Sequence, residues 1–181
     1  FKVKALKPDL LVVSGHSKGA ALSVRQMDEL GVSVNMLAMT HCESAKLHNK
    51  EKFGNLADHA LCAAQWAPSV TSEGTVFGTA GNYSAIFDNE YGYVPPYQAA
   101  ESSAAVIVMA DAITRANSLD KDAVRDALAA TDLSTFYGQI KFSEAGNNIA
   151  KPMILRQLID GKYYVVAPAN VATDELVYPS P

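Results

Sequence analysis

The pentapeptide Gly15-His16-Ser17-Lys18-Gly19 fits the pattern G-x-S-x-G, in which a serine is exposed as a nucleophile on a sharp turn. An apolar run, Leu10 to Val13, precedes it and a helical pattern follows, so the strand, turn and helix that this chemistry requires are all predicted. The same turn could instead present His16 and Ser17 to a bound ligand, or simply cap the helix. Because such short motifs often match by chance, the three interpretations stay open.

A serine nucleophile needs an acid and then a histidine base after it in the chain. The histidines that follow Ser17 are His41, His48 and His59. The first two come before any strand that could carry the acid. His59 directly follows Asp58 at a predicted strand start, which is the wrong edge of the sheet for catalysis. An α/β-hydrolase with Ser17 as its nucleophile is therefore the alternative hypothesis, and the main expectation is a protein that is not an enzyme.

A second group of residues suits the binding of a small molecule, because aromatic rings supply apolar contact area and polar tips fix orientation. These candidates lie at predicted strand ends and at the start of a long predicted helix. They are His16, Ser17, Thr40, His41, Trp66, Tyr97, Gln98 and Glu101. For Trp66 and Tyr97, a place in the hydrophobic core is the more common alternative.

The composition limits the function further. A chain of 181 residues with 49% hydrophobic and 19% charged residues is long enough for one or two globular domains. Its net charge is -4 and it has no basic cluster, so no nucleic-acid partner is expected. Cys42 and Cys62 permit a disulfide without requiring one, and neither stands in a metal-binding spacing. No metal or cofactor is expected.

Strands and helices are predicted to alternate in the first third of the chain, which is typical of a doubly wound α/β sheet. They cover residues 10–13, 20–30, 34–39, 43–53 and 59–66. Because the strand 10–13 is apolar at every position, we expect it to be buried on both faces. A loose stretch over 67–81 then precedes three predicted helices and the final strands. These cover residues 83–91, 95–117, 121–130, 136–142 and 153–167, the last as a hairpin around Asp160-Gly161.

Seven phrases, in this order, carry a resemblance to a known family. They are KPDLLVVSGH, VRQMDELG, VNMLAMTHC, FGTAGNYSAIFDNEYGYVPPYQAAESSAA, AITRANSLDKDAVRDALAAT, TFYGQIKFSEAGN and LIDGKYYVVAP. Together they resemble the type I periplasmic solute-binding proteins of ABC importers, in the branched-chain amino-acid-binding family. The resemblance covers nearly the whole chain.

The resemblance implies an α/β fold of two lobes, each a parallel sheet flanked by helices, with a solute bound in the cleft between them. Residues 1–68 would form a second-lobe segment, 69–150 a mostly helical returning part of the first lobe, and 151–181 a second-lobe hairpin and tail. The implied function is the capture of an amino acid, amide or aromatic carboxylate for delivery to the permease of an ABC transporter. A periplasmic location is implied, with a signal peptide that is not in this chain. A ligand-sensing regulatory domain would share the fold.

Two departures from the family pattern shape these expectations. The loop after the second strand often supplies an acid for a ligand ammonium, whereas here it holds Thr40 and His41. The imidazoles of His16 and His41, together with Trp66 and Tyr97, suit a carboxylate, aromatic acids included, so an α-amino acid is not the expected ligand. The first-lobe strands and the opening of the second lobe also have no counterpart here. We therefore expect the C-terminal half of a longer protein, associated with its missing N-terminal half or with a swapped copy.

Overall fold

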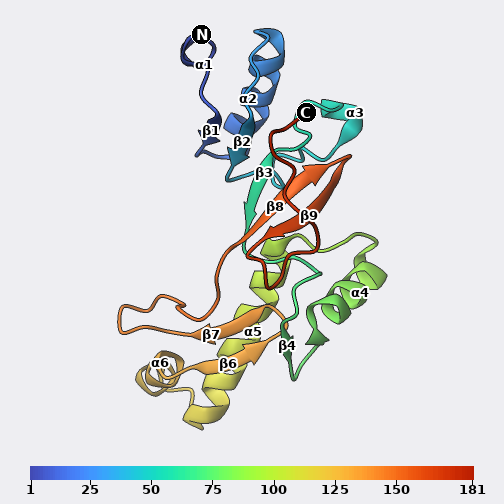
Figure 1. Ribbon diagram of the computed structural model, residues 1–181. Coiled ribbons are helices and arrows are strands. Elements are labelled where there is room, and N and C mark those ends of the chain that lie inside the picture. Colours follow the sequence, from blue (N-terminus) through green and yellow to red (C-terminus); the bar gives the residue numbers. More distant parts are fainter. The chain divides into compact units, whose positions relative to one another are not determined.

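The computed structural model describes all 181 residues and contains two compact units (Figure 1). Unit 1 comprises residues 1–64 and 154–181, and unit 2 comprises residues 65–153. Each unit has a hydrophobic core of its own. The assignment of residues 1–68, 69–150 and 151–181 to lobes of a larger protein stays a prediction.

Unit 1 contains a five-stranded sheet in the order β1-β2-β3-β8-β9. β1 (Leu10–Val13), β2 (Met36–Met39) and β3 (Leu61–Ala64) are parallel, and the hairpin of β8 (Ile154–Ile159) and β9 (Lys162–Ala167) continues the sheet in antiparallel pairing. The hairpin predicted around Asp160-Gly161 is confirmed. Both turn residues have positive φ, 49° and 76°, which the favoured two-residue hairpin turn requires.

Helices α1 (Lys2–Leu6), α2 (Ser17–Glu29) and α3 (Lys50–Phe53) complete unit 1. The helix predicted over 43–53 is wrong in extent, since residues 42–48 form turns and α3 has only four residues. Two local features explain this. Lys46 adopts a positive φ of 56°, which interrupts a helix, and the side chain of Asn49 accepts a hydrogen bond from the Lys52 N–H and starts α3 as an N-cap.

The expectation that the first strand is buried on both faces is also wrong. Leu11 and Val13 pack on the core beneath α2, but Leu10 is 51% exposed and Val12 59% exposed. β1 is an edge strand of the sheet, so one row of its backbone groups also has no neighbouring strand in unit 1.

Unit 2 is mainly helical. It contains α4 (Ala80–Tyr91), α5 (Tyr97–Ala116) and α6 (Lys121–Ala129), which confirms three successive helices, together with two small hairpins. The hairpins are β4 (Glu73–Gly74) with β5 (Gly78–Thr79), and β6 (Asp132–Thr135) with β7 (Gly138–Lys141). The strand predicted over 136–142 is therefore wrong at its start. Residues 136 and 137 form a turn because the hydroxyl of Thr135 accepts hydrogen bonds from the N–H groups of Tyr137 and Gly138.

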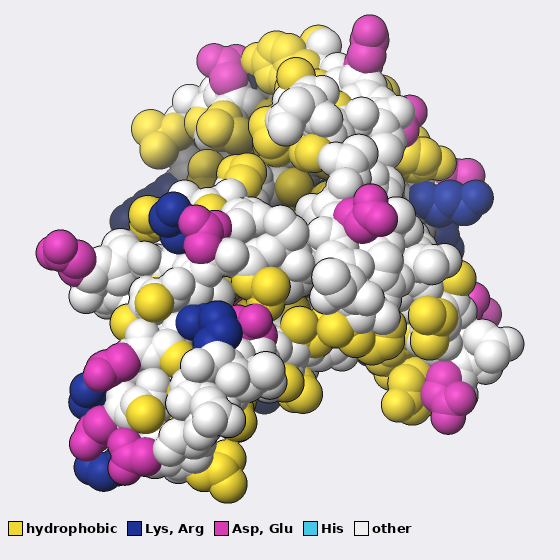
Figure 2. All heavy atoms as spheres, turned by 90° about the horizontal axis from the view of Figure 1, so that it is seen from below, with side chains coloured by type: hydrophobic (Ala, Val, Ile, Leu, Met, Phe, Trp, Pro, Cys, Tyr) yellow, Lys and Arg dark blue, Asp and Glu magenta, His cyan; other side chains and the backbone are white.

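An aromatic cluster forms the core of unit 2. The rings of Tyr83 and Phe136 stack with centroids 4.0 Å apart, and Trp66 meets both edge to face. α5 presents small apolar residues to this core at intervals of four. They are Ala100, Ala104, Val108 and Ala112. Acidic and basic side chains alternate on the exposed surface of α6 (Figure 2), where Arg125 pairs with Asp122 and Asp126. None of the helices combines the length and apolar character that crossing a membrane requires.

Candidate functional site

Four of the residues predicted from the sequence gather at one edge of the unit 1 sheet. β1 and β2 are parallel neighbours, so the loops that follow them lie side by side. His16 follows β1 as the N-cap of α2, in extended conformation, and Ser17 is the first residue of that helix. Thr40 and His41 directly follow β2. The rings of His16 and His41 have centroids 5.1 Å apart, so the two loops bring two imidazoles together.

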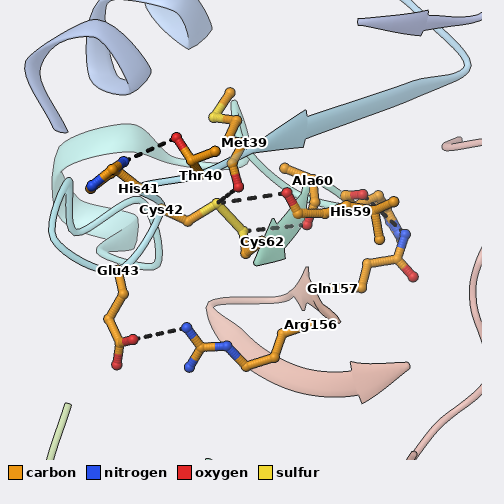
Figure 3. The surroundings of a disulfide bond; sticks show 11 residues. Met39, Thr40, His41, Cys42, Glu43, His59, Ala60, Cys62, Arg156 and Gln157 are labelled. Carbon is orange, nitrogen blue, oxygen red and sulfur yellow. Dashed lines mark hydrogen bonds and ion pairs between the residues drawn. A yellow bond between two sulfur atoms is a disulfide. The ribbon is translucent and has the colours of Figure 1, made fainter. Parts of the chain in front are cut away.

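The hydroxyl of Thr40 joins these two loops. It accepts a hydrogen bond from the Gly15 N–H at 3.2 Å and donates one to the Gly15 carbonyl at 2.9 Å. Nδ1 of His41 lies 3.0 Å from the same oxygen (Figure 3). Since the hydroxyl hydrogen is used on Gly15, this network assigns a hydrogen to Nδ1 of His41. Nε2 of His41 makes no hydrogen bond within the chain, so it is the atom that this ring can offer to a solute.

Ser17 lacks the surroundings of a catalytic nucleophile. The predicted strand, turn and helix are present, but no hydrogen bond joins Ser17 to a histidine and its φ is not positive. The nearby imidazole of His41 is directed by its hydrogen bond to Thr40 instead. The base and the strained turn on which a serine hydrolase depends are therefore not assembled around Ser17.

The other predicted residues belong to unit 2. Trp66 is only 1% exposed and its indole N–H donates to the Phe136 carbonyl at 3.2 Å, so it occupies a core position. Tyr97, Gln98 and Glu101 lie on the first turns of α5. Burial is the main cause that raises the pKa of the Tyr137 phenol, and the nearby Glu101 and Tyr97 raise it further.

Sequence reasoning missed Tyr137 and Lys151, which line a pocket of about 670 Å³ in unit 2. The Lys151 ammonium lies 4.4 Å from the centroid of the Tyr137 ring and donates to the Gln65 carbonyl. Burial lowers the pKa of Lys151 to about 8, and Glu101 partly opposes that shift. Glu101 and the apolar side chains of α5 form part of the same pocket. No local pattern marks Lys151, because its partners are far away in the sequence.

A disulfide follows the candidate residues directly. Cys42 and Cys62, whose pairing the sequence left open, are bonded with their Cα atoms 5.7 Å apart, and the neighbouring Glu43 pairs with Arg156 (Figure 3). No group of three or more histidine, cysteine or acidic side chains is arranged to hold a metal ion.

Residues 2–162 match the model of a protein family described as "Periplasmic binding protein". The chain belongs to this family. The family consists of binding proteins, so the main expectation from the sequence is confirmed and the hydrolase alternative is not supported.

Solved structures share the fold, although none of the following exceeds 23% sequence identity. A leucine-binding protein from Thermotoga maritima is 23% identical, with a TM-score of 0.77 over 90% of this chain and 45% of its own. A solute-binding protein of an ABC transporter from R. palustris, in complex with benzoate, is 20% identical, with a TM-score of 0.68 over 97% of this chain and 47% of its own. A leucine-, isoleucine-, valine-, threonine- and alanine-binding protein from Brucella ovis is 13% identical, with a TM-score of 0.73 over 97% of this chain and 47% of its own. The chain thus spans slightly less than half the length of these proteins.

Proposed function

We propose that this chain supplies solute-binding residues to the substrate-binding component of an ABC importer, which captures a small organic solute in the periplasm and delivers it to a membrane permease. The observation that carries the proposal is the cluster of His16, Thr40 and His41 at the carboxyl ends of two parallel strands, which is where ligands bind in open α/β sheets. Ser17 is a further proposed contact of the solute, and Tyr97, Gln98 and Glu101 on the first turns of α5 are proposed solute contacts of unit 2, with Trp66 in the core of that unit.

The charges around the cluster favour a carboxylate solute over an ammonium. Two imidazoles meet there, and Lys18 lies in the first turn of α2. Glu43, the acid nearest to His41 along the chain, is engaged by Arg156 at 2.8 Å. The site therefore has donors for an anion and no free acid in its second loop. We propose a small organic carboxylate, aromatic acids included, and the benzoate bound by one of the similar proteins supports this choice.

Calorimetric titration with benzoate and with leucine tests the proposal. We expect benzoate to bind, and the His16→Ala and His41→Ala variants each to bind it about tenfold or more weakly, as for loss of a charge-assisted hydrogen bond. His59→Asn is the matched control. It removes a histidine of the same unit, and asparagine tolerates the positive φ of 65° at that position.

Two outcomes would contradict the proposal in different ways. Leucine binding that is tighter than benzoate binding and insensitive to both histidine substitutions would exclude the carboxylate assignment. Failure of both benzoate and leucine to bind would exclude both compounds as solutes of this chain.

The proposal includes a partner for β1. The exposed Leu10 and Val12 lie on an edge strand, and the similar proteins are about twice as long. We propose that a further polypeptide segment of the same fold covers this edge. A native mass spectrum should then show the 19.3 kDa chain in a heavier complex, which Val12→Lys weakens. A complex of exactly two identical chains would indicate a swapped copy instead, and a stable bare monomer would exclude both partners.

A further inference from the structure

The loop that carries Thr40 and His41 is fixed to the sheet at the next two residues. Cys42 is bonded to Cys62 of β3, and the carboxylate of Glu43 accepts a hydrogen bond from the Arg156 guanidinium of β8 at 2.8 Å (Figure 3). One covalent and one ionic anchor therefore follow the candidate site without an intervening residue.

The two anchors reach the same place in the sheet. Cys62 and Arg156 are register partners in the antiparallel pairing of β3 with β8. On its other side, Thr40 is tied to Gly15 by two hydrogen bonds. Thr40 and His41 therefore lie between two attachments. The hydrogen bonds to Gly15 hold the segment at the end of β1, and the disulfide and the ion pair hold it to β3 and β8. Neither residue can shift far while both attachments hold.

The surroundings of Arg156 make the ionic anchor specific. Its side chain is 6% exposed, and the Tyr163 ring lies 4.6 Å from the guanidinium carbon. Nε of Arg156 is buried without a hydrogen-bond partner. The carboxylate of Glu43 is therefore the group that compensates the buried positive charge of Arg156. Removing the partner of such a buried charge strongly destabilises the fold. The same pair withholds the Glu43 carboxylate from the solute site.

We propose that the Cys42–Cys62 disulfide and the Glu43–Arg156 pair are positioning elements for the solute-binding side chains of Thr40 and His41. The inference rests on the proposed function. The disulfide holds the His41 ring beside His16, and the ion pair keeps the second loop free of negative charge. None of the four residues needs to touch the solute.

A double-mutant cycle between the disulfide and His41 tests the proposal. The Cys42→Ala/Cys62→Ala variant should bind benzoate about tenfold more weakly than the native chain, because the His41 ring is then no longer held beside His16 and the two substitutions are coupled. In the His41→Ala background the same cysteine substitutions should change the benzoate affinity by less than about twofold. Val24→Ala, which removes packing from the same core cluster but keeps the disulfide, should lower stability and leave the affinity unchanged. Equal losses in both backgrounds would overturn the positioning role.

A second measurement does not depend on solute. Nuclear Overhauser contacts between the His16 and His41 ring protons should be present in the native chain and in Val24→Ala, and lost in Cys42→Ala/Cys62→Ala. If the cysteine variant does not fold, Glu43→Gln takes its place. Persistence of the ring contacts overturns the inference even when benzoate binds. Failure of benzoate to bind the native chain counts against the proposed function alone, because the ring contacts still decide whether the anchors position His41.

Discussion

At the scale of single residues, one hydroxyl organises the candidate site. Thr40 was predicted as a candidate because it ends a strand, but its bonds to Gly15 follow from the register that places Val13 opposite Met39. Sequence reasoning can place both loops at one edge of a parallel sheet, whereas it cannot determine which side chains meet across it. The same limit applies to Trp66, since its apolar ring at a strand end is compatible with either a ligand wall or the core, and it lies in the core.

Replacing Thr40 by valine removes this link while keeping the side-chain shape. We expect Thr40→Val to lower the free energy of unfolding by only about 0.5–1.5 kcal/mol, because the freed Gly15 groups are near solvent. The larger effect should be on benzoate affinity, since the His41 ring loses its acceptor at Thr40. Urea unfolding and calorimetric titration measure the two effects. Thr40→Ser keeps the hydroxyl and should preserve both properties, and equal weakening by serine and valine would contradict the assigned link.

Lys151 predicts a pH dependence of stability. Burial lowers the pKa of Lys151 to about 8 from an ordinary value of 10.5, so above pH 8 the unfolded chain holds more protons at this site than the folded chain does. Stability should therefore rise as the pH increases from about 8 toward 10.5. Urea unfolding between pH 7.5 and 9.0 measures this rise, in a range where most tyrosines of the unfolded chain still hold their protons.

The Lys151→Met variant should lose that rise. Lys141→Met is the matched control, because Lys141 is an exposed lysine of the same unit that pairs with Asp132 at 2.6 Å. The control should keep the pH dependence of the native chain. An unchanged slope in Lys151→Met would show that the folded chain does not disfavour the charged form of this lysine.

At the scale of elements, local patterns were sufficient where a segment is long or its turn chemistry is strong. The strand Leu10–Val13, the long α5 and the hairpin around Asp160-Gly161 were all predicted. The hairpin of β4 and β5 was missed because strands of two residues are too short to show a period. The turn between β6 and β7 was missed because the Thr135 hydroxyl creates it, and an apolar Phe136-Tyr137 pair is typical of a strand.

Two glycines of unit 2 should respond in opposite ways to the same substitution. A Cβ on Gly74 would lie 2.6 Å from Cα of Thr135 and 2.8 Å from the Ser134 carbonyl oxygen. Both atoms belong to the backbone, so Gly74→Ala must displace β4 from β6, and we expect a loss of about 1–3 kcal/mol. Gly81 lies in the first turn of α4, where the nearest atom to a Cβ is 3.7 Å away.

Gly81→Ala should therefore stabilise the chain by about 0.5–1 kcal/mol through better helix propensity. Chemical unfolding of both variants under one set of conditions provides the comparison. A destabilising Gly81→Ala, or a neutral Gly74→Ala, would contradict the packing described for the corresponding element.

At the scale of the whole molecule, the division into two units follows from two separate cores. The first joins α2 with the sheet of unit 1, and the second is the aromatic cluster of unit 2. The chain passes through unit 1, then unit 2, then unit 1 again, so β3 pairs with residues 90 or more positions away in the sequence, as in the pairing of Cys62 with Arg156. The sequence pattern alone predicted the strands β8 and β9, and the family resemblance implied that they belong to the same lobe as the first strands of the chain.

The two cores should make thermal unfolding depart from a single two-state transition. Scanning calorimetry of the native chain should resolve two components. Val24→Ala, in the core of unit 1, should lower the transition temperature of only one component, and Val108→Ala, in the core of unit 2, only that of the other. Each loss should be that of a truncated core side chain.

The same calorimetry shows which unit binds the solute. Benzoate at about 100 times its dissociation constant should stabilise the unit that binds it by about 2.7 kcal/mol. A shift of both components would support the proposed solute contacts of Tyr97, Gln98 and Glu101 in unit 2. A shift of the unit 1 component alone would confine binding to the cluster of His16 and His41 and exclude contacts from Tyr97, Gln98 and Glu101.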